Sequence, residues 1–218
     1  MGKIILLFAI HTSKQALIEQ YNVEWFEIFK DRSIKHFEEV NQDIPKIGKS
    51  IFSMNYKFAS AYIAWYKALS ELSVEPDEID KIIWMLNENM MRKFPKSILR
   101  ISGKLYLNSF KEKATAHIKR QQKGIAHPYD WMIDFKPINN NEFEITIKEC
   151  AYKKLAKKFN VERMLPGICR MDYLMANIMG NGFTRTKTLG DGDDCCNCHY
   201  AKVGYCEWAP QNGFIHRK

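Results

Sequence analysis

The sequence has no apolar run that could cross a membrane. The longest one, Ile4–Ile10, has seven residues, whereas a helix that spans a bilayer needs about 20. Lys3 precedes this run as it would in a secretion signal, but His11–Lys14 follow where small residues would surround a cleavage site. We therefore expect a cytoplasmic protein without a membrane partner.

Glycine, proline and cysteine are also scarce. The 11 Gly and 7 Pro show no period, which excludes collagen-like and low-complexity sequences. Six cysteines in 218 residues are too few for a disulfide scaffold, so we expect free thiols. Glycine-rich phosphate loops, the Gly-x-Ser-x-Gly nucleophile turn and the His-Glu-x-x-His zinc motif are absent, and with them the protein classes that they mark.

Apolar and charged residues are present in globular proportions. Hydrophobic residues make up 46% and charged residues 27%, which suits one large or two small folded domains. The formal net charge of +8 favours an anionic partner. The basic stretch 111–123 has no nucleic-acid-binding motif beside it, so we interpret it as solvated helix surface and do not expect a nucleic acid. A homodimer is expected only because dimers are common.

The hydrophobic pattern changes at about residue 124. Before it, apolar residues recur every three or four positions, which predicts helices over Glu24–Val40, Ile51–Leu72, Pro76 to Pro95, and Ser97 to Ile118. After it, alternation and turn residues predict strands over Tyr129–Lys136, Glu142–Cys150, Phe183–Leu189 and Cys196–Lys202. Two further helices are predicted over Ala151–Phe159 and Ile168–Met179.

This pattern predicts an α+β fold in two regions. Residues 1–124 form a helical N-terminal region. Residues 125–218 form an α+β region that contains the candidate site. In it, a small antiparallel sheet packs with the helical half and carries helices on one face.

All six cysteines lie in the last 70 residues, and two of them have a metal-binding spacing. Cys195-x-x-Cys198 can chelate zinc, with His199 and Cys206 as further ligands. No second pair stands at a conventional distance, so buried thiols are the favoured interpretation and a catalytic thiol the next. We expect no cofactor, and Cys195, Cys198 and Cys206 are the candidate ligands if zinc is bound.

A second group lies on the helix after Pro166. Cys169 and Asp172 are three residues apart and share a face, so a thiol and a carboxylate meet near the helix start. The helix dipole lowers a thiolate pKa there, which favours a nucleophile and a base. The alternative is a packed thiol beside a capping carboxylate.

A third group is the strand with Arg185 and Lys187, which point to the same face. An arginine fork there suits a carboxylate. The alternative for this group is a solvated face of the sheet.

The order of these residues resembles the L-2-amino-thiazoline-4-carboxylic acid hydrolase family. The similar run is Cys150 … Leu165-Pro166-x-x-Cys169-x-x-Asp172 … Arg185-Thr-x-Thr188-Leu-x-x-Gly192-Asp-x-x-Cys196, and the resemblance extends over roughly residues 20–202. It implies a hydrolase that opens the ring of 2-amino-thiazoline-4-carboxylate, a small anionic substrate, to a carbamoyl-cysteine.

The resemblance also implies roles for single residues. Cys169 or Cys196 would be the nucleophile or would orient water, with Asp172 as base and His199 as acid. Arg185 would hold the substrate carboxylate. Thr188, Cys150 and Asn197 would contact the substrate too. Removal of the nucleophile or of Arg185 is then expected to stop turnover while the melting temperature stays nearly unchanged.

The last strand departs from the family pattern. The family usually has Cys-Asp-Phe-Arg-Phe, whereas this chain has Cys196, Asn197, Cys198, His199 and Tyr200. If these two positions touch the substrate in the family, this protein binds a different compound or is inactive on the named one. A sensor domain that binds a small ligand or a metal without catalysis is therefore the alternative function.

Overall fold

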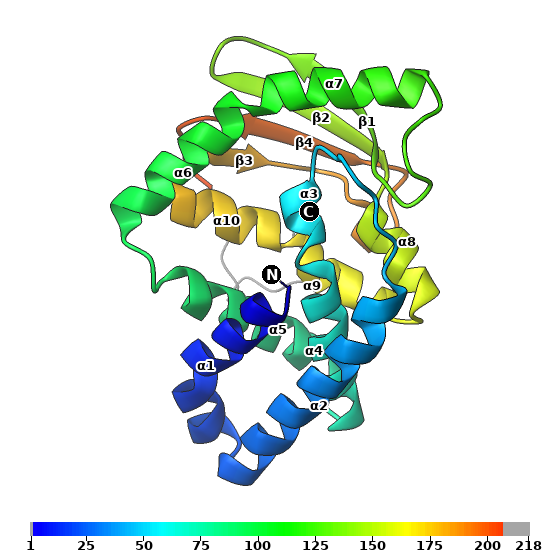
Figure 1. The fold of residues 1–218 in the computed structure, drawn as a ribbon. Helices are drawn as coiled ribbons and strands as arrows, with labels where there is room; N and C mark the ends of the chain where they lie inside the picture. Colours follow the sequence, from blue (N-terminus) through cyan, green and yellow to red (C-terminus); the bar gives the residue numbers. More distant parts are fainter. Residues whose placement is uncertain (1, 207–218) are drawn as a thin grey trace.

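The structure is a computed structural model, and it describes residues 2–206. Helices fill the chain up to residue 122 (Figure 1). They are α1 (Gly2–Gln20), α2 (Val23–Asp43), α3 (Ser53–Tyr56), α4 (Ala59–Glu71), α5 (Pro76–Met91), α6 (Lys96–Asn108) and α7 (Phe110–Gln122).

Helices α2 and α5 show why the predicted periodicity was sound. Helix α2 begins after Asn22, whose side chain accepts a hydrogen bond of 2.8 Å from the Trp25 N–H, a typical N-cap. Its stripe from Phe26 to Val40 is buried. Helix α5 begins at Pro76, where the missing N–H of proline costs nothing, and acidic residues follow in its first turn.

The C-terminal part contains a four-stranded antiparallel sheet with the order β1-β2-β4-β3. The strands are β1 (Met132–Pro137), β2 (Glu142–Glu149), β3 (Gly182–Thr184) and β4 (Cys196–Ala201). Between β2 and β3 lie α8 (Ala151–Lys158), the 3-10 turn η1 (Glu162–Met164), α9 (Leu165–Cys169) and α10 (Met171–Met179). A second 3-10 turn, η2 (Leu189–Asp191), precedes β4. The predicted α+β class is confirmed.

One face of the sheet is covered by helices and the other is polar. On the covered face, Ile145 lies opposite Cys198, and the Phe110 ring of α7 stacks on Phe143 with centroids 5.2 Å apart. On the other face, Thr146 lies opposite Asn197. We call these the inner and outer faces. Side chains alternate between them along each strand, so neighbouring residues of β4 point to opposite sides.

Four predicted elements differ in the structure, and one of them is the helix predicted over Ile168–Met179, which is divided between α9 and α10 at Arg170. The helix predicted over Ile51–Leu72 is α3 and α4, and the one predicted over Ser97 to Ile118 ends at Asn108 and restarts at Phe110. The strand predicted over Phe183–Leu189 stops at Thr184. Beyond it, the N–H groups of Thr186 and Lys187 donate to the Asn197 side-chain oxygen, at 3.0 and 2.7 Å, in place of a strand partner.

The run Ile4–Ile10 lies in α1, where Leu6, Ala9 and Ile10 are buried. Within residues 2–206, no helix has the length and apolar character that a membrane crossing requires.

Candidate active site at the start of α10

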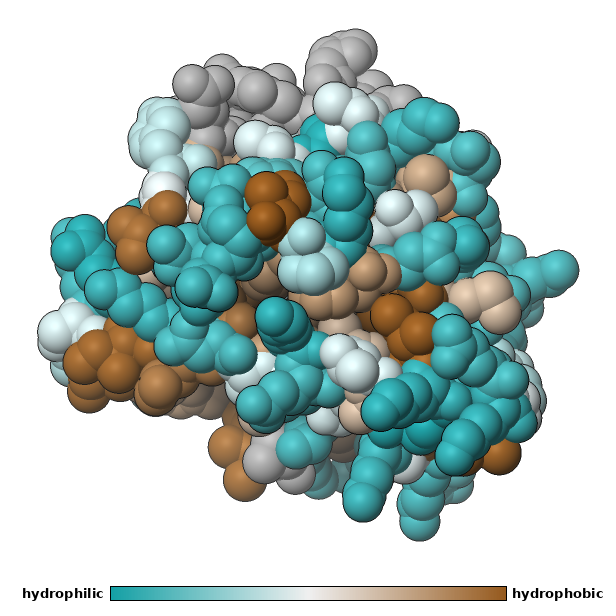
Figure 2. Space-filling view, turned by 90° about the horizontal axis from the view of Figure 1, so that it is seen from above, coloured by the Kyte–Doolittle hydropathy of each residue, from teal (hydrophilic) through white to brown (hydrophobic). Residues whose placement is uncertain are grey.

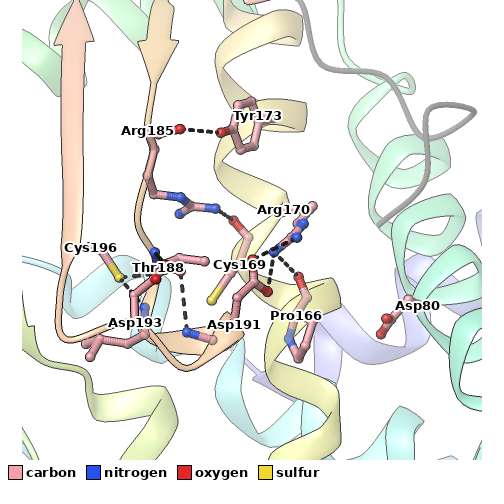
Figure 3. A network of polar contacts seen from close by, with 12 residues as sticks. Asp80, Pro166, Cys169, Arg170, Tyr173, Arg185, Thr188, Asp191, Asp193 and Cys196 are labelled. Carbon is pink, nitrogen blue, oxygen red and sulfur yellow. Dashed lines mark hydrogen bonds and ion pairs between the residues drawn. The ribbon is translucent and has the colours of Figure 1, made fainter. Parts of the chain in front are cut away.

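The site is built around the junction of α9 and α10. Cys169 ends α9 and Asp172 lies in the first turn of α10. Between them, the fully buried Arg170 donates to both carboxylate oxygens of Asp191, at 2.8 and 2.9 Å (Figure 3). This bidentate pair ties turn η2 to the junction, and it brings residues far apart in the sequence to the same place.

Turn η2 lies against the thiols of two cysteines, Cys169 and Cys196. The Leu189 N–H donates to the Cys196 sulfur at 3.3 Å, and the Thr188 hydroxyl oxygen lies 3.5 Å from the same sulfur. Gly190 approaches Cys169 so closely that a Cβ at this position would lie 2.5 Å from its sulfur. Cys169 and Cys196 therefore flank one short turn, as Figure 3 shows.

Arg185 holds the Asp172 carboxylate. Its Nη1 lies 3.1 Å from Asp172 Oδ2, and its Nη2 donates to the Cys169 carbonyl oxygen at 2.8 Å. The guanidinium carbon also lies over the Tyr173 and Phe183 rings, 5.3 and 5.5 Å from their centroids. Only 1% of the Arg185 side chain is exposed, against 37% for Asp172. Asp172 is therefore the member of this pair that can meet a ligand.

This geometry corrects two predictions about Arg185. Its guanidinium is buried and already engaged by Asp172 and Cys169, so it does not offer a free fork to a substrate carboxylate. Because it is buried and charged, its removal should also lower stability, contrary to the expected unchanged melting temperature. Lys187, predicted on the same face, is half exposed and pairs with Asp194 at 3.1 Å.

The Asp172 carboxylate is both accessible and desolvated. Its side chain keeps accessible surface, yet desolvation by the surrounding protein is the largest cause that raises its pKa, and Arg185 partly offsets this rise. This combination is typical of a carboxylate in a partly enclosed space. We call this space the Asp172 recess.

Four tyrosines surround the recess. The Asp172 charge is among the causes that raise the pKa of each phenol, after desolvation. They are Tyr62, Tyr106, Tyr152 and Tyr200. Of these, Tyr62 donates to Asn87 Oδ1 at 3.0 Å and Tyr152 to the Asn55 carbonyl at 2.5 Å. Within residues 2–206, the hydroxyls of Tyr106 and Tyr200 have no hydrogen-bond partner, so they remain able to bind a ligand.

Three of the candidate thiols belong to the same site. Desolvation raises the pKa of Cys169 to about 11 and that of Cys150 to about 12, and it raises the pKa of Cys196 too. The charges of Cys150, Cys169 and Cys196 act on one another in these shifts. At neutral pH all three are therefore protonated thiols. Thr188, also predicted to contact the substrate, lies beside these thiols, with its hydroxyl oxygen 3.5 Å from the Cys196 sulfur.

Two predicted site residues lie elsewhere. Asn197 and His199 are on the outer face, because strand alternation sends Cys196 and Cys198 inward. Asn197 bonds the Thr186 and Lys187 backbone, and His199 Nε2 lies 3.6 Å from Glu142 Oε2. They border an outer hollow of about 330 Å³ that Arg185 and Cys198 also line. Asn197 and His199 thus lie on the face of the sheet away from Cys196, and their roles as substrate contact and acid stay predictions.

The candidate zinc ligands do not converge either. Cys198 is buried on the inner face, whereas Cys195 precedes β4 and is partly exposed. Among residues 2–206, no three His, Cys, Asp or Glu side chains are grouped so that they could hold a metal ion. Cys206 is buried near α10, where its carbonyl oxygen accepts a bond of 3.3 Å from Asn177.

Sequence reasoning missed the four tyrosines. None of the four was predicted as a site residue, although Tyr200 was named in the last strand of the family pattern. The available signal was the chemistry of the residue type, since a phenol buried on a helix or strand needs a partner for its hydroxyl.

The protein is an α+β protein in which the carboxylate of Asp172 lies beside the neutral thiols at the junction of α9 and α10. The chain belongs to the L-2-amino-thiazoline-4-carboxylic acid hydrolase family, whose model matches residues 54–200. The matched segment runs from α3 to β4 and contains every residue assigned to the recess. Comparisons with curated proteins and with solved structures gave no significant match.

Proposed function

We propose that this protein is a hydrolase that opens a small, anionic sulfur- and nitrogen-containing ring such as 2-amino-thiazoline-4-carboxylate, with Asp172 as the general base. The observation that carries the proposal is the Asp172 carboxylate itself, which is desolvated, partly accessible and fixed by Arg185. A base works best when its pKa lies near the working pH, and desolvation moves the pKa of Asp172 in that direction. Family membership supports the class of substrate.

The reaction adds one water molecule to the substrate and breaks one carbon–sulfur bond of the ring. The ring carbon between sulfur and nitrogen is electrophilic. As a water molecule attacks this carbon, Asp172 takes one proton from the water. The electron pair of the C=N bond moves to the ring nitrogen, which takes the second proton of the water as the carbonyl forms. The bond from that carbon to the ring sulfur breaks, and the sulfur leaves with its electron pair and receives the first proton from Asp172. The product is a carbamoyl-cysteine with a free thiol, and its composition is that of the substrate plus one water.

Water is the favoured nucleophile because the thiols are protonated. A thiolate is the reactive form of cysteine, and desolvation holds the pKa of Cys169 at about 11. In this mechanism Cys150, Cys169 and Cys196 line the recess as neutral, polarisable groups. The unpartnered hydroxyls of Tyr106 and Tyr200 are the donors for the substrate carboxylate, a role for which Arg185 is too deeply buried.

The test is release of a free thiol from 2-amino-thiazoline-4-carboxylate, followed with a thiol reagent at catalytic protein concentrations. Asp172→Asn keeps the shape of the side chain and removes the base. We expect kcat/KM to fall by about 10²–10⁴-fold, the usual contribution of general base catalysis. Cys169→Ala should retain activity within about tenfold, because no covalent step passes through that sulfur.

Each outcome decides between mechanisms. An equal, large loss for Cys169→Ala and Asp172→Asn would replace water with a cysteine nucleophile. Full activity of Asp172→Asn on the thiazoline would overturn the assignment of the base. Tight binding of the thiazoline without turnover by wild-type protein would favour the sensor function.

A further inference from the structure

The charge of this protein is concentrated in one segment. Between Lys93 and Lys123 there are nine basic residues and one acidic residue, Glu112. This segment therefore carries a net charge of +8, equal to the formal charge of the whole chain, and the rest of the chain is balanced. The segment comprises α6 and α7, and we call it the α6–α7 arm.

Most basic side chains of the arm are exposed, and two of them, Arg120 and Lys113, contact neighbouring rings of the arm, those of His117 and Tyr106. Lys96, Arg100 and Lys104 of α6 are exposed. Among the ion pairs within residues 2–206, none involves a basic residue of the arm. This contrasts with Arg92 just before it, which pairs with Glu88 at 2.6 Å. Unpaired, exposed charges of one sign produce a positive surface potential that extends over about a Debye length.

The arm also exposes an apolar stripe. Ile98, Ile101 and Leu105 recur at three- and four-residue steps on α6, and their exposed fractions are 52%, 58% and 63%. Phe94, just before the helix, is 45% exposed. The opposite face of α6 is buried through Leu99 and Leu107. Figure 2 shows brown side chains gathered on the side of the molecule where α6 lies in Figure 1. Helix α6 thus has one apolar face inside the fold and a second one outside.

We propose that the α6–α7 arm is a docking surface for an anionic lipid membrane. A helix with exposed apolar residues on one face and Lys and Arg beside them is suited to lie in the plane of the lipid headgroups. Each Lys or Arg that comes near an anionic lipid surface contributes about 1 kcal/mol to membrane binding. The contributions of several basic residues of the arm therefore add up. No helix of the described chain is able to span a bilayer, so the contact is made at the surface of the membrane.

The observations favour this occupant over two others. A second copy docked on the same face would place two arms with a net charge of +8 each against one another, which is electrostatically unfavourable. A nucleic acid would use the basic residues but would leave the Ile98–Leu105 stripe exposed to water, because its outer surface is a charged phosphate backbone. Of these three occupants, a membrane is the one that takes up both the charge and the apolar stripe.

The experiment is co-sedimentation of the full-length protein with vesicles. One set contains only phosphatidylcholine, and the other contains phosphatidylcholine mixed with anionic phosphatidylglycerol. We expect binding to the anionic vesicles at low salt and release at high salt, since screening weakens the attraction. The variant Ile98→Ser/Ile101→Ser/Leu105→Ser should lose more than about tenfold in partition coefficient, and Arg100→Gln/Lys104→Gln a comparable amount.

Matched controls use exposed residues outside the arm. Val23→Ser/Val203→Ser replaces exposed apolar side chains, and Lys46→Gln/Lys49→Gln replaces exposed charges. Both should bind like wild type, and thermal melting of each variant establishes that it is folded.

Three results would overturn the proposal. The first is absence of wild-type binding to anionic vesicles. The second is loss of binding in the charge variant while the serine variant binds normally, which would indicate a general polyanion site. The third is a dimer in solution that the serine variant dissociates, which would assign the stripe to self-association.

Discussion

Replacing Arg185 with glutamine should destabilise the fold through Asp172. The variant leaves the Asp172 carboxylate desolvated without its cation and the Cys169 carbonyl without its 2.8 Å donor. Breaking a buried ion pair by removing one partner costs about 3–5 kcal/mol. Because Asp172 keeps 37% of its side chain accessible, we take the lower end, about 3 kcal/mol. For a chain of this size, this lowers the melting temperature by about 6–12 °C.

The loss should depend on pH in a defined direction. Arg185 lowers the pKa of Asp172, so this pKa rises further in Arg185→Gln. In that variant the charged form of the carboxylate is destabilised in the folded protein. The deficit in unfolding free energy is therefore largest at pH values above the pKa of Asp172. It shrinks as the pH falls and the carboxylate takes up a proton.

The assay is urea unfolding at several pH values, with Asp172→Asn and the double variant completing a mutant cycle. The double variant should lose less than the sum of the two single losses, because both remove the same pair. Arg92→Gln is the control, since Arg92 forms an exposed pair with Glu88 and should cost less than about 1 kcal/mol. A loss below about 1 kcal/mol for Arg185→Gln, or simple additivity in the cycle, would refute the reasoning.

Three further predictions concern other parts of the molecule. Desolvation raises the pKa of buried Asp80 to about 6 from 3.8, so the folded state binds this proton more tightly than the unfolded chain does. Asp80→Asn should therefore gain up to about 3 kcal/mol relative to wild type as the pH rises from about 4 to 7, and a difference that stays constant in urea unfolding would contradict this. Gly190→Ala should cost about 1–3 kcal/mol by pushing on the Cys169 sulfur, and an unchanged melting temperature would show that the turn yields freely. His199→Gln should leave kcat/KM within about twofold, since the outer face is not part of the recess, whereas a loss as large as that of Asp172→Asn would return His199 to the mechanism.

Much of the fold was predictable because local patterns and packing agree. Local sequence preferences agree with the tertiary structure at three places. These are the buried stripe of α2, the start of α5 at Pro76 and the alternating burial along Glu142–Glu149. The early end of β3 was not predictable. The side chain of Asn197, 11 residues beyond Thr186, takes over the backbone bonds that a neighbouring strand would have supplied.

The candidate site was predicted in part for a similar reason. The spacing of Cys169 and Asp172 places both near the start of α10, and the structure joins them to Cys150, Cys196 and Thr188. The burial of Arg185 depends on the Tyr173 and Phe183 rings that enclose it, which no spacing in the sequence reveals. The position of His199 follows from strand alternation, which sends Cys196 and Cys198 to the inner face and His199 to the outer face.

The most direct test of the account is a titration of the Asp172 carboxyl group in the wild-type protein. Carbon-detected NMR follows its ionisation, and the resonance is assigned by its loss in Asp172→Asn. We predict a pKa above the ordinary aspartate value of 3.8, because the recess desolvates the carboxylate more than Arg185 stabilises it. An ordinary or lowered pKa would mean that Asp172 is solvated or fully neutralised by Arg185, and it would contradict its role as the base.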